Sequence, residues 1–316
     1  MVSERSVRAV AFAPAHVTGI FAPELKARDP RARGSIGAGL ALELGAFAEA
    51  EFRPGTGHAL RVTSDLGIPV PISTEVAHRL RPSRGGRLLV HLRHELPVGQ
   101  GFGMSAAAAV ATALAVARVA GRTRAEAIEV AHLADLFGRG GLGGVASIVG
   151  GGGLEFRRRG GIPPFGEVEH IALEGTLFVG VTGPPLPSPR LLGNDRFLAR
   201  VQVASDGLDE LLRHPAPTSF FYLSERFTDR LGLAPRRLKR VLRELRARGA
   251  WAGQAMFGQS FFARPKGPAS RAEIVDWLER SGLRAVELAP ASRGPHLRRP
   301  GTAQDPDRRP RRSQLF

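Results

Sequence analysis

Three glycines and a serine alternate with other residues in a stretch that has almost no large side chains, PVGQGFGMSAAAA: Gly99, Gly101, Gly103 and Ser105. Glycine lets the backbone adopt positive φ and approach a ligand closely. Backbone N–H groups at the start of a helix bind anions, because the helix dipole adds positive charge there. The stretch therefore predicts a phosphate site, with the Ser105 hydroxyl next to a phosphate or its metal ion. The alternative is a tight turn into a core helix.

The flanking residues predict the strand and the helix that such a site needs. The segment 86–96 alternates in hydrophobicity, which indicates a half-buried strand that ends at Pro97. An alanine-rich helix should run from the loop to about Val119 and stop at Gly121. Thr123 and Glu126, three residues apart, then predict the capping box of the next helix.

Two other phosphate motifs are excluded. The pattern G-x-x-x-x-G-K-[ST] is absent, which argues against a P-loop NTPase. The segment GRGGLG (138–143) fits the dinucleotide pattern G-x-G-x-x-G, but it follows a helix instead of a strand. The glycine stretch at 97–108 is therefore the candidate for the phosphate loop.

That stretch resembles the phosphate loop of the GHMP kinases, whose pattern is roughly P-x-G-x-G-L-G-S-S-A-A. The matching residues are Pro97, Gly99, Gly101, Gly103, Ser105, Ala106 and Ala107. Phe102 replaces the leucine of the pattern, and Met104 replaces its first serine.

Further segments narrow the resemblance to the archaeal pantoate kinases of coenzyme A biosynthesis. They are APAHVTGIF (13–21), GSIGAG (34–39), AHLAD with GLGGV (131–145), PTSFFYLSERFTDRLGL (217–233) and GAWAGQAMFGQSFFA (249–263). The resemblance covers about residues 10–263. It implies an α+β fold of two lobes with the active site in the cleft between them. It also implies transfer of the γ-phosphoryl group of MgATP to the primary hydroxyl of pantoate, giving 4-phosphopantoate.

The resemblance assigns roles to individual residues. The ATP-binding residues would be Pro97, Gly99, Gly101, Gly103, Ser105 and Ala106. Ser105 and Asp135 would hold Mg²⁺, which needs few protein ligands. Ser35, His132 and Arg157 match positions that bind pantoate.

The chemistry of the individual side chains is compatible with these assignments, although each residue could also have a purely structural role. Arg157 could bind a carboxylate with two parallel donors, but without the resemblance its place in RRR favours a surface arginine. His132 lies one helical turn before Asp135, so the two should face the same side. A partly buried helical histidine is the alternative for His132. His16 stands where many GHMP kinases have a lysine, and its role is left open.

Two positions depart from the family pattern. Asp135 stands where the family has the longer glutamate, and Gly144 stands where it has the aspartate of G-L-G-D-V. That aspartate would orient or deprotonate the attacking hydroxyl. A positioned base contributes about 10²–10⁴-fold to the rate. We therefore expect slow phosphorylation, carried by the glycine loop, Ser105, Asp135 and Mg²⁺. Two alternatives stay open, an impaired homologue that binds nucleotide or pantoate and a GHMP kinase for another small alcohol.

The chain of 316 residues has 45 Lys and Arg against 29 Asp and Glu, a net charge of +16. Part of this charge lies in 293–316, which is rich in Pro and Arg and predicts a disordered tail. More lies on one face of a predicted helix at 236–249, whose other face is apolar. No aromatic residues interleave with the basic clusters, so nucleic acid is only a minor alternative.

The remaining features predict a cytoplasmic protein of two lobes. Cysteine is absent, the longest apolar run (104–117) is too short to cross a bilayer, and the first residues do not form a signal peptide. We expect an N-terminal lobe over 1–157, a C-terminal lobe over 158–292 and then the tail. The first apolar strand should break at Pro14. The sequence leaves a homodimer open.

Overall fold

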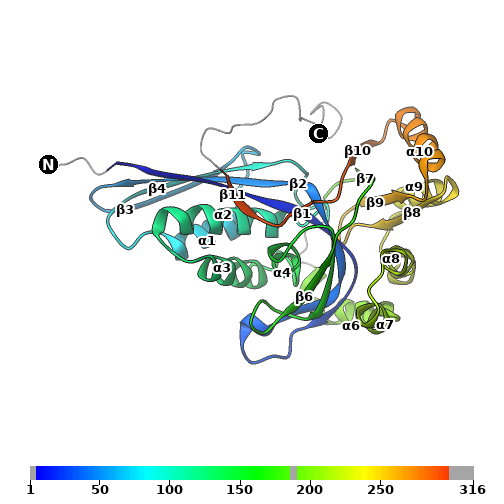
Figure 1. The fold of residues 1–316 in the computed structure, drawn as a ribbon, viewed down its shortest axis with the longest axis horizontal. Helices are drawn as coiled ribbons and strands as arrows, with labels where there is room; N and C mark the ends of the chain where they lie inside the picture. Colours follow the sequence, from blue (N-terminus) through cyan, green and yellow to red (C-terminus); the bar gives the residue numbers. More distant parts are fainter. Residues whose placement is uncertain (1–4, 186–190, 299–316) are drawn as a thin grey trace.

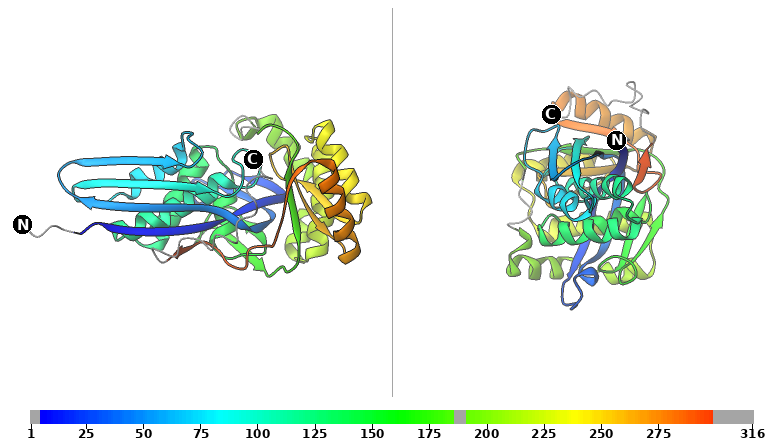
Figure 2. Two further views of the ribbon diagram at one scale, coloured as in Figure 1. Left: turned by 90° about the horizontal axis from the view of Figure 1, so that it is seen from above. Right: turned by 90° about the vertical axis from the view of Figure 1, so that its left-hand side faces the viewer.

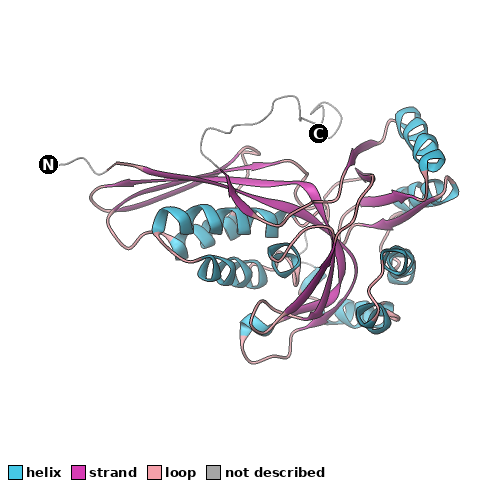
Figure 3. Ribbon diagram, viewed as in Figure 1, coloured by secondary structure: helices cyan, strands magenta, loops and turns pink. Residues whose placement is uncertain are grey.

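A computed structural model describes residues 5–185 and 191–298, which form an α+β fold with two β-sheets (Figure 1, Figure 3). The first sheet has the strand order β11-β1-β2-β4-β3, and β5 pairs with both β2 and β6. Its strands are β1 (Val7–Glu24), β2 (Gly34–Pro54), β3 (His58–Ser64), β4 (Gly86–His94), β5 (Leu154–Arg159), β6 (Glu167–Ile171) and β11 (His296–Arg298). The second sheet has the order β10-β7-β9-β8. Its strands are β7 (Leu177–Val181), β8 (Ala250–Gln254), β9 (Ser260–Pro265) and β10 (Arg284–Leu288).

The first strand does not break at Pro14, contrary to the sequence-based expectation. β1 continues to Glu24 and pairs with β2 along its whole length, with Pro14 opposite Gly45. The pairing register shifts between Pro14 and Ala15. A bulge tolerates a proline in a sheet because the ladder is already interrupted there. His16 lies in this strand two residues after Pro14, opposite Ala41 of β2.

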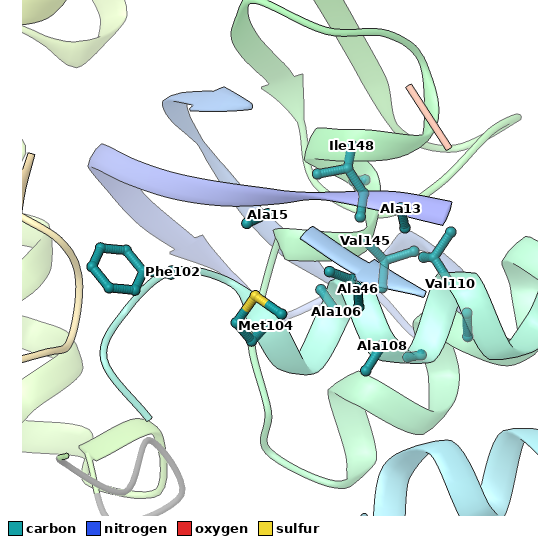
Figure 4. Close-up of a cluster of buried hydrophobic side chains, with 14 of the residues drawn as sticks. Ala13, Ala15, Ala46, Phe102, Met104, Ala106, Ala108, Val110, Val145 and Ile148 are labelled. Atoms are coloured by element: carbon teal, nitrogen blue, oxygen red, sulfur yellow. The ribbon is translucent and has the colours of Figure 1, made fainter. Parts of the chain in front are cut away.

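Helix α2 (Met104–Ala120) lies against β1 and β2, and α1 (Pro71–Leu80) and α3 (Arg124–Phe137) flank it. Its alanines are buried on nearly every side, as expected for a helix that is apolar all round. Small side chains let α4 (Gly144–Val149) approach it closely, and Figure 4 shows Val145 and Ile148 beside the start of α2. Gly121 ends α2 in the left-handed conformation, and the capping box of Thr123 and Glu126 is confirmed.

The helices of the C-terminal half pack against both sheets. They are α6 (Asp195–Ala204), α7 (Leu208–Arg213), α8 (Pro217–Leu231), α9 (Arg236–Ala247) and α10 (Pro268–Ser281). Helices α9 and α10 contact the second sheet, and α8 contacts both β8 and β1 (Figure 2). The apolar face predicted for α9 is confirmed, because Leu238, Val241, Leu242 and Leu245 are buried.

The observed sheets refine the expected boundaries. A division at residue 157 would cut β5, and β6 still belongs to the first sheet, so the change of sheet falls between β6 and β7. The expected tail also begins too early. His296–Arg298 forms β11 and pairs with Val10–Phe12 of β1, because the main chain returns to a free sheet edge whatever its composition. The rest of that tail, 299–316, lies outside the described residues. Within the described ranges, no helix is both long enough and apolar enough to span a membrane.

Candidate active site

A cavity of about 630 Å³ opens between the two halves of the molecule. One wall comes from the glycine loop and the start of α2, and another from the end of α3 and the segment 138–144. Leu192, Met256 and Phe257 close the cavity from the C-terminal half. Most of the residues predicted for the site line it together: Ser35, Gly99, Gly101, Gly103, Ser105, Ala106, Asp135 and Gly144. Pro97, His132 and Arg157 are not on its wall.

The glycine loop requires glycine at the three alternating positions. Gly99, Gly101 and Gly103 have φ values of 76°, 75° and 61°, a region that other residues rarely adopt. A Cβ at Gly101 would overlap the backbone of Ala255, and one at Gly103 would lie 2.8 Å from the carbonyl oxygen of His16. The loop is therefore held between β1 and the C-terminal half while its last glycine begins α2.

Ser105 and Asp135 meet at the junction of α2 and α3. Ser105 Oγ donates a hydrogen bond to Asp135 Oδ1 at 2.7 Å. Burial raises the pKa of Asp135 to about 6, although the Ser105 hydrogen bond acts in the opposite direction. Gly140 lies directly over the pair, because a Cβ there would overlap both Asp135 Oδ1 and Ser105 Oγ. The pair forms an oxygen-rich corner beside the glycine loop.

Gly144 begins α4 and faces α2. Its φ is not positive, and a Cβ there would lie 2.8 Å from the Cβ of Ala106. Such a contact is shorter than real Cβ atoms show, so a side chain at this position requires α4 or α2 to shift. The preceding Gly143 approaches Ser35 Oγ and the Arg157 guanidinium, where a Cβ would come within 2.5 Å and 2.8 Å of them.

Arg157 is buried, so the surface interpretation of RRR is wrong for this residue. Its Nε donates to the carbonyl oxygen of Ser35 at 3.2 Å, and its Nη1 donates to Ser147 Oγ at 2.6 Å. The same Nη1 forms an ion pair with Glu155. Arg157 thus lies behind Ser35, which is on the cavity wall.

Glu155 is the residue that sequence analysis missed. It is completely buried, and its Oε1 bonds both His16 Nε2, at 2.9 Å, and Arg157. Its Oε2 has no hydrogen-bond partner among the described residues. The segment LEFRRR could have indicated this ion pair. Glu155 and Arg157 are two residues apart and therefore share one face of a strand.

His132 is buried in α3 against the turn that precedes β2. Burial lowers its pKa, whereas the carbonyl groups of Pro30 and Arg33 act to raise it. Its Nε2 has no partner among the described residues. His132 and Asp135 have different surroundings, since His132 lies against the Pro30 and Arg33 carbonyl groups whereas Asp135 contacts Ser105 and lies on the cavity wall.

Comparison with known proteins gives a consistent picture. Residues 72–152 match the family model described as the GHMP kinases N terminal domain. The chain is 33% identical to a pantoate kinase of Thermococcus kodakarensis over 241 residues, which cover 74% of this chain and 80% of that protein. It is 27% identical to a pantoate kinase of Methanospirillum hungatei over 277 residues, which cover 85% of this chain and 90% of that protein.

Solved structures share the fold. A phosphotransferase related to the CoA biosynthesis pathway superposes with a TM-score of 0.82 at 27% identity, over 93% of this chain and 99% of that one. A homoserine kinase from Cytophaga hutchinsonii gives 0.65 at 15% identity, over 94% and 99%. A mevalonate diphosphate decarboxylase from Staphylococcus aureus gives 0.67 at 14% identity, over 93% and 99%. The last two share the fold, and because one fold hosts several reactions, the residues of the cavity must decide the chemistry.

Proposed function

The chain belongs to the pantoate kinase family of the GHMP kinases, and from this premise we propose that it transfers the γ-phosphoryl group of ATP to the primary hydroxyl of pantoate. The product is 4-phosphopantoate, which would serve coenzyme A biosynthesis. The observation that carries the proposal is that one cavity is lined by both the glycine loop and Ser35. A phosphate donor and a small hydroxy acid can therefore meet in it.

The glycine loop is the proposed site for the phosphates of ATP. The first turn of α2 begins after Gly103, which has no side chain to cap its N–H groups. Uncapped N–H groups and the helix dipole together favour a bound anion. Positive φ at the three glycines shapes the loop without side chains that would fill the phosphate position.

Ser105 and Asp135 are the proposed protein ligands of Mg²⁺. Both donors are oxygen atoms, and they already lie 2.7 Å apart. Within the described residues no cluster of three acidic or histidine side chains could hold a metal alone, which fits an ion that is bound mainly through substrate phosphates. When bound, Mg²⁺ neutralises phosphate charge and lowers the barrier to phosphoryl transfer.

The carboxylate of pantoate is proposed to bind near Ser35. Ser35 lies on the wall, and the Arg157 guanidinium behind it donates a hydrogen bond to the Ser35 carbonyl oxygen. His132 contributes indirectly, since it packs against the turn at Pro30 and Arg33 that leads into Ser35. We propose no nucleic-acid partner, and we place the reaction in the cytoplasm, where ATP is the common phosphoryl donor.

Gly144 favours one second candidate, an impaired homologue that binds both ligands without efficient transfer. No carboxylate is available at this position to take the hydroxyl proton. The rate is then low unless another residue of the cavity accepts it. Another small alcohol as the acceptor is the remaining alternative.

The test is ATP consumption with and without pantoate, alongside a panel of other small hydroxy acids and alcohols. We expect pantoate to give the highest rate. Gly101→Ala should abolish turnover, because it strains a positive φ and overlaps Ala255. Gly55→Ala is the matched control, since nothing lies within 4 Å of a Cβ at Gly55. Faster turnover with another acceptor would refute the proposed substrate, and binding of both ligands without turnover would favour the impaired homologue.

A further inference from the structure

His16 lies where the glycine loop meets β1. The backbone N–H of His16 donates to the carbonyl oxygen of Phe102 at 3.0 Å. A Cβ placed on Gly103 would lie 3.1 Å from the Cβ of His16. His16 also lines the cavity. Its imidazole is therefore anchored next to the end of the loop that is proposed to hold phosphate.

On its other side, the ring is connected to the proposed carboxylate site. His16 Nε2 bonds Glu155 Oε1 at 2.9 Å, Glu155 pairs with Arg157, and Arg157 Nε donates to the Ser35 carbonyl oxygen at 3.2 Å. These contacts link the phosphate end of the cavity to the pantoate end. A hydroxyl that attacks the γ-phosphate must lie between the two ends, and His16 is a cavity-lining residue that these contacts connect to both.

The Glu155 contact fixes which nitrogen of His16 can act as a base. A carboxylate only accepts hydrogen bonds, so Nε2 carries the proton and Nδ1 keeps its lone pair. Nδ1 makes no hydrogen bond to any residue of the described chain. Burial lowers the pKa of His16, although Glu155 acts to raise it, so the neutral imidazole is favoured. A histidine oriented by a buried carboxylate is an arrangement that serves general-base catalysis on several folds.

The glycines of GSIGAG explain how this arrangement fits into the sheet. Gly39 lies beside the contact, because a Cβ there would overlap both His16 Nε2 and Glu155 Oε1. A Cβ at Gly37 would lie 2.6 Å from Arg157 Nη2. Alanine at either position would push the polar groups apart. The absence of side chains at Gly37 and Gly39 therefore leaves room for the hydrogen-bonded groups of His16, Glu155 and Arg157.

We propose that His16 is the catalytic base of this kinase, that Glu155 is its positioning residue, and that together they replace the carboxylate missing at Gly144. The inference rests on the proposed function. His16 Nδ1 takes the proton of the substrate hydroxyl while an oxygen lone pair forms the new bond to the γ-phosphorus. The bond from the γ-phosphorus to the β–γ bridging oxygen breaks, and its electron pair leaves with ADP. The imidazolium, paired with Glu155, then returns its proton to solvent.

The main test is His16→Gln, because the amide nitrogen of glutamine can occupy the place of Nε2 and keep the bond to Glu155. The variant keeps this contact but has no base. We expect kcat to fall by about 10²–10⁴-fold, with the affinities for MgATP and pantoate within about threefold of wild type. His296→Gln is the control, since this histidine of β11 contacts the ring of Phe12 in β1 and does not line the cavity. A kcat for His16→Gln within threefold of wild type would overturn the proposal.

The second test is Glu155→Gln, read through the pH dependence of kcat. The titratable groups that influence His16 are Glu155 and Arg157 from β5 and His170 from β6. Glu155 raises the pKa of His16, so its neutral replacement should move the acid limb of the profile to lower pH. It should also lower kcat, because the imidazolium loses its counter-charge. A merely structural role would leave the position of the limb unchanged, and that result would refute the role of Glu155.

These tests separate failure of this inference from failure of the proposed function. If wild type phosphorylates an alcohol other than pantoate, the same variants can be measured with that acceptor. If His16→Gln does not fold, as judged by melting and circular dichroism, His16→Asn replaces it, and the same loss of kcat is expected. Wild type that binds both ligands but transfers no phosphoryl group would overturn the assignment of a base together with the kinase activity.

Discussion

Ser105 in the first turn of α2 and Asp135 in the last turn of α3 are joined by a 2.7 Å hydrogen bond, although they are 30 residues apart in sequence. The bond holds a buried carboxylate at the end of the glycine loop, where a metal-bound nucleotide is proposed to lie. A buried carboxylate without a cation lowers the free energy of unfolding. The Ser105–Asp135 pair therefore favours ligand binding but destabilises the ligand-free protein.

Asp135→Asn should stabilise the ligand-free protein. The folded pKa of about 6 exceeds that of an ordinary carboxyl, so the stability that protonated Asp135 contributes at low pH is lost as pH rises from about 4 to about 6. Above pH 6 the variant should exceed wild type in its free energy of unfolding by about 3 kcal/mol. Urea unfolding at pH 4 and pH 8 without metal checks this. MgATP binding should weaken in the same variant, and an equal stability difference at both pH values would contradict the expectation.

Gly140→Ala should disrupt the hydrogen-bonded pair of Ser105 and Asp135. The new methyl group would overlap Asp135 Oδ1 and Ser105 Oγ, so the hydrogen bond between them must break or the loop must move. We expect MgATP affinity to fall at least about tenfold, which corresponds to about 1.4 kcal/mol. Isothermal titration calorimetry measures this, with Gly55→Ala as the control in open space. Unchanged affinity in a folded Gly140→Ala protein would show that the corner does not bind nucleotide.

Gly144→Asp should lower the melting temperature, because its Cβ would lie 2.8 Å from Ala106 on a helix that is buried nearly all round. A typical overpacking cost is about 1–3 kcal/mol. In the His16→Gln background the same change should raise kcat per folded molecule, since it supplies the carboxylate that the family resemblance predicts at this position. Stopped assays must therefore be normalised to the folded fraction. No gain in the double variant would show that residue 144 cannot reach the hydroxyl.

Truncation separates the two parts of the basic C-terminal segment. The segment 299–316 is rich in Pro and Arg and lacks apolar periodicity, so its removal should leave the melting temperature nearly constant. Removal from 293 onward deletes β11, the tilted ring contact of His296 with Phe12 and the hydrogen bond from Arg124 to the Pro295 carbonyl oxygen. That second truncation should lower the melting temperature by several degrees, since about 1 kcal/mol shifts it by roughly 2–4 °C at this size. Equal melting temperatures would mean that β11 contributes nothing to stability.

The sequence by itself determined those features of the protein that depend on residues close together along the chain. Alternating glycines before an alanine-rich segment predicted a loop with positive φ and a buried helix, and both are present. The capping box and the apolar face of α9 followed equally from local spacing. Each of these features is fixed by backbone conformation or by helical periodicity, which a short window of sequence contains.

Only the tertiary structure decided which polar groups meet. His16 and Glu155 are 139 residues apart, and no local pattern indicates that β1 and β5 bring their side chains together. The burial of Arg157, the passage of β1 through Pro14 and the pairing of β11 with β1 were predicted wrongly for the same reason. Composition describes how a segment behaves alone in water, whereas burial and pairing depend on the surfaces that the rest of the chain presents to it.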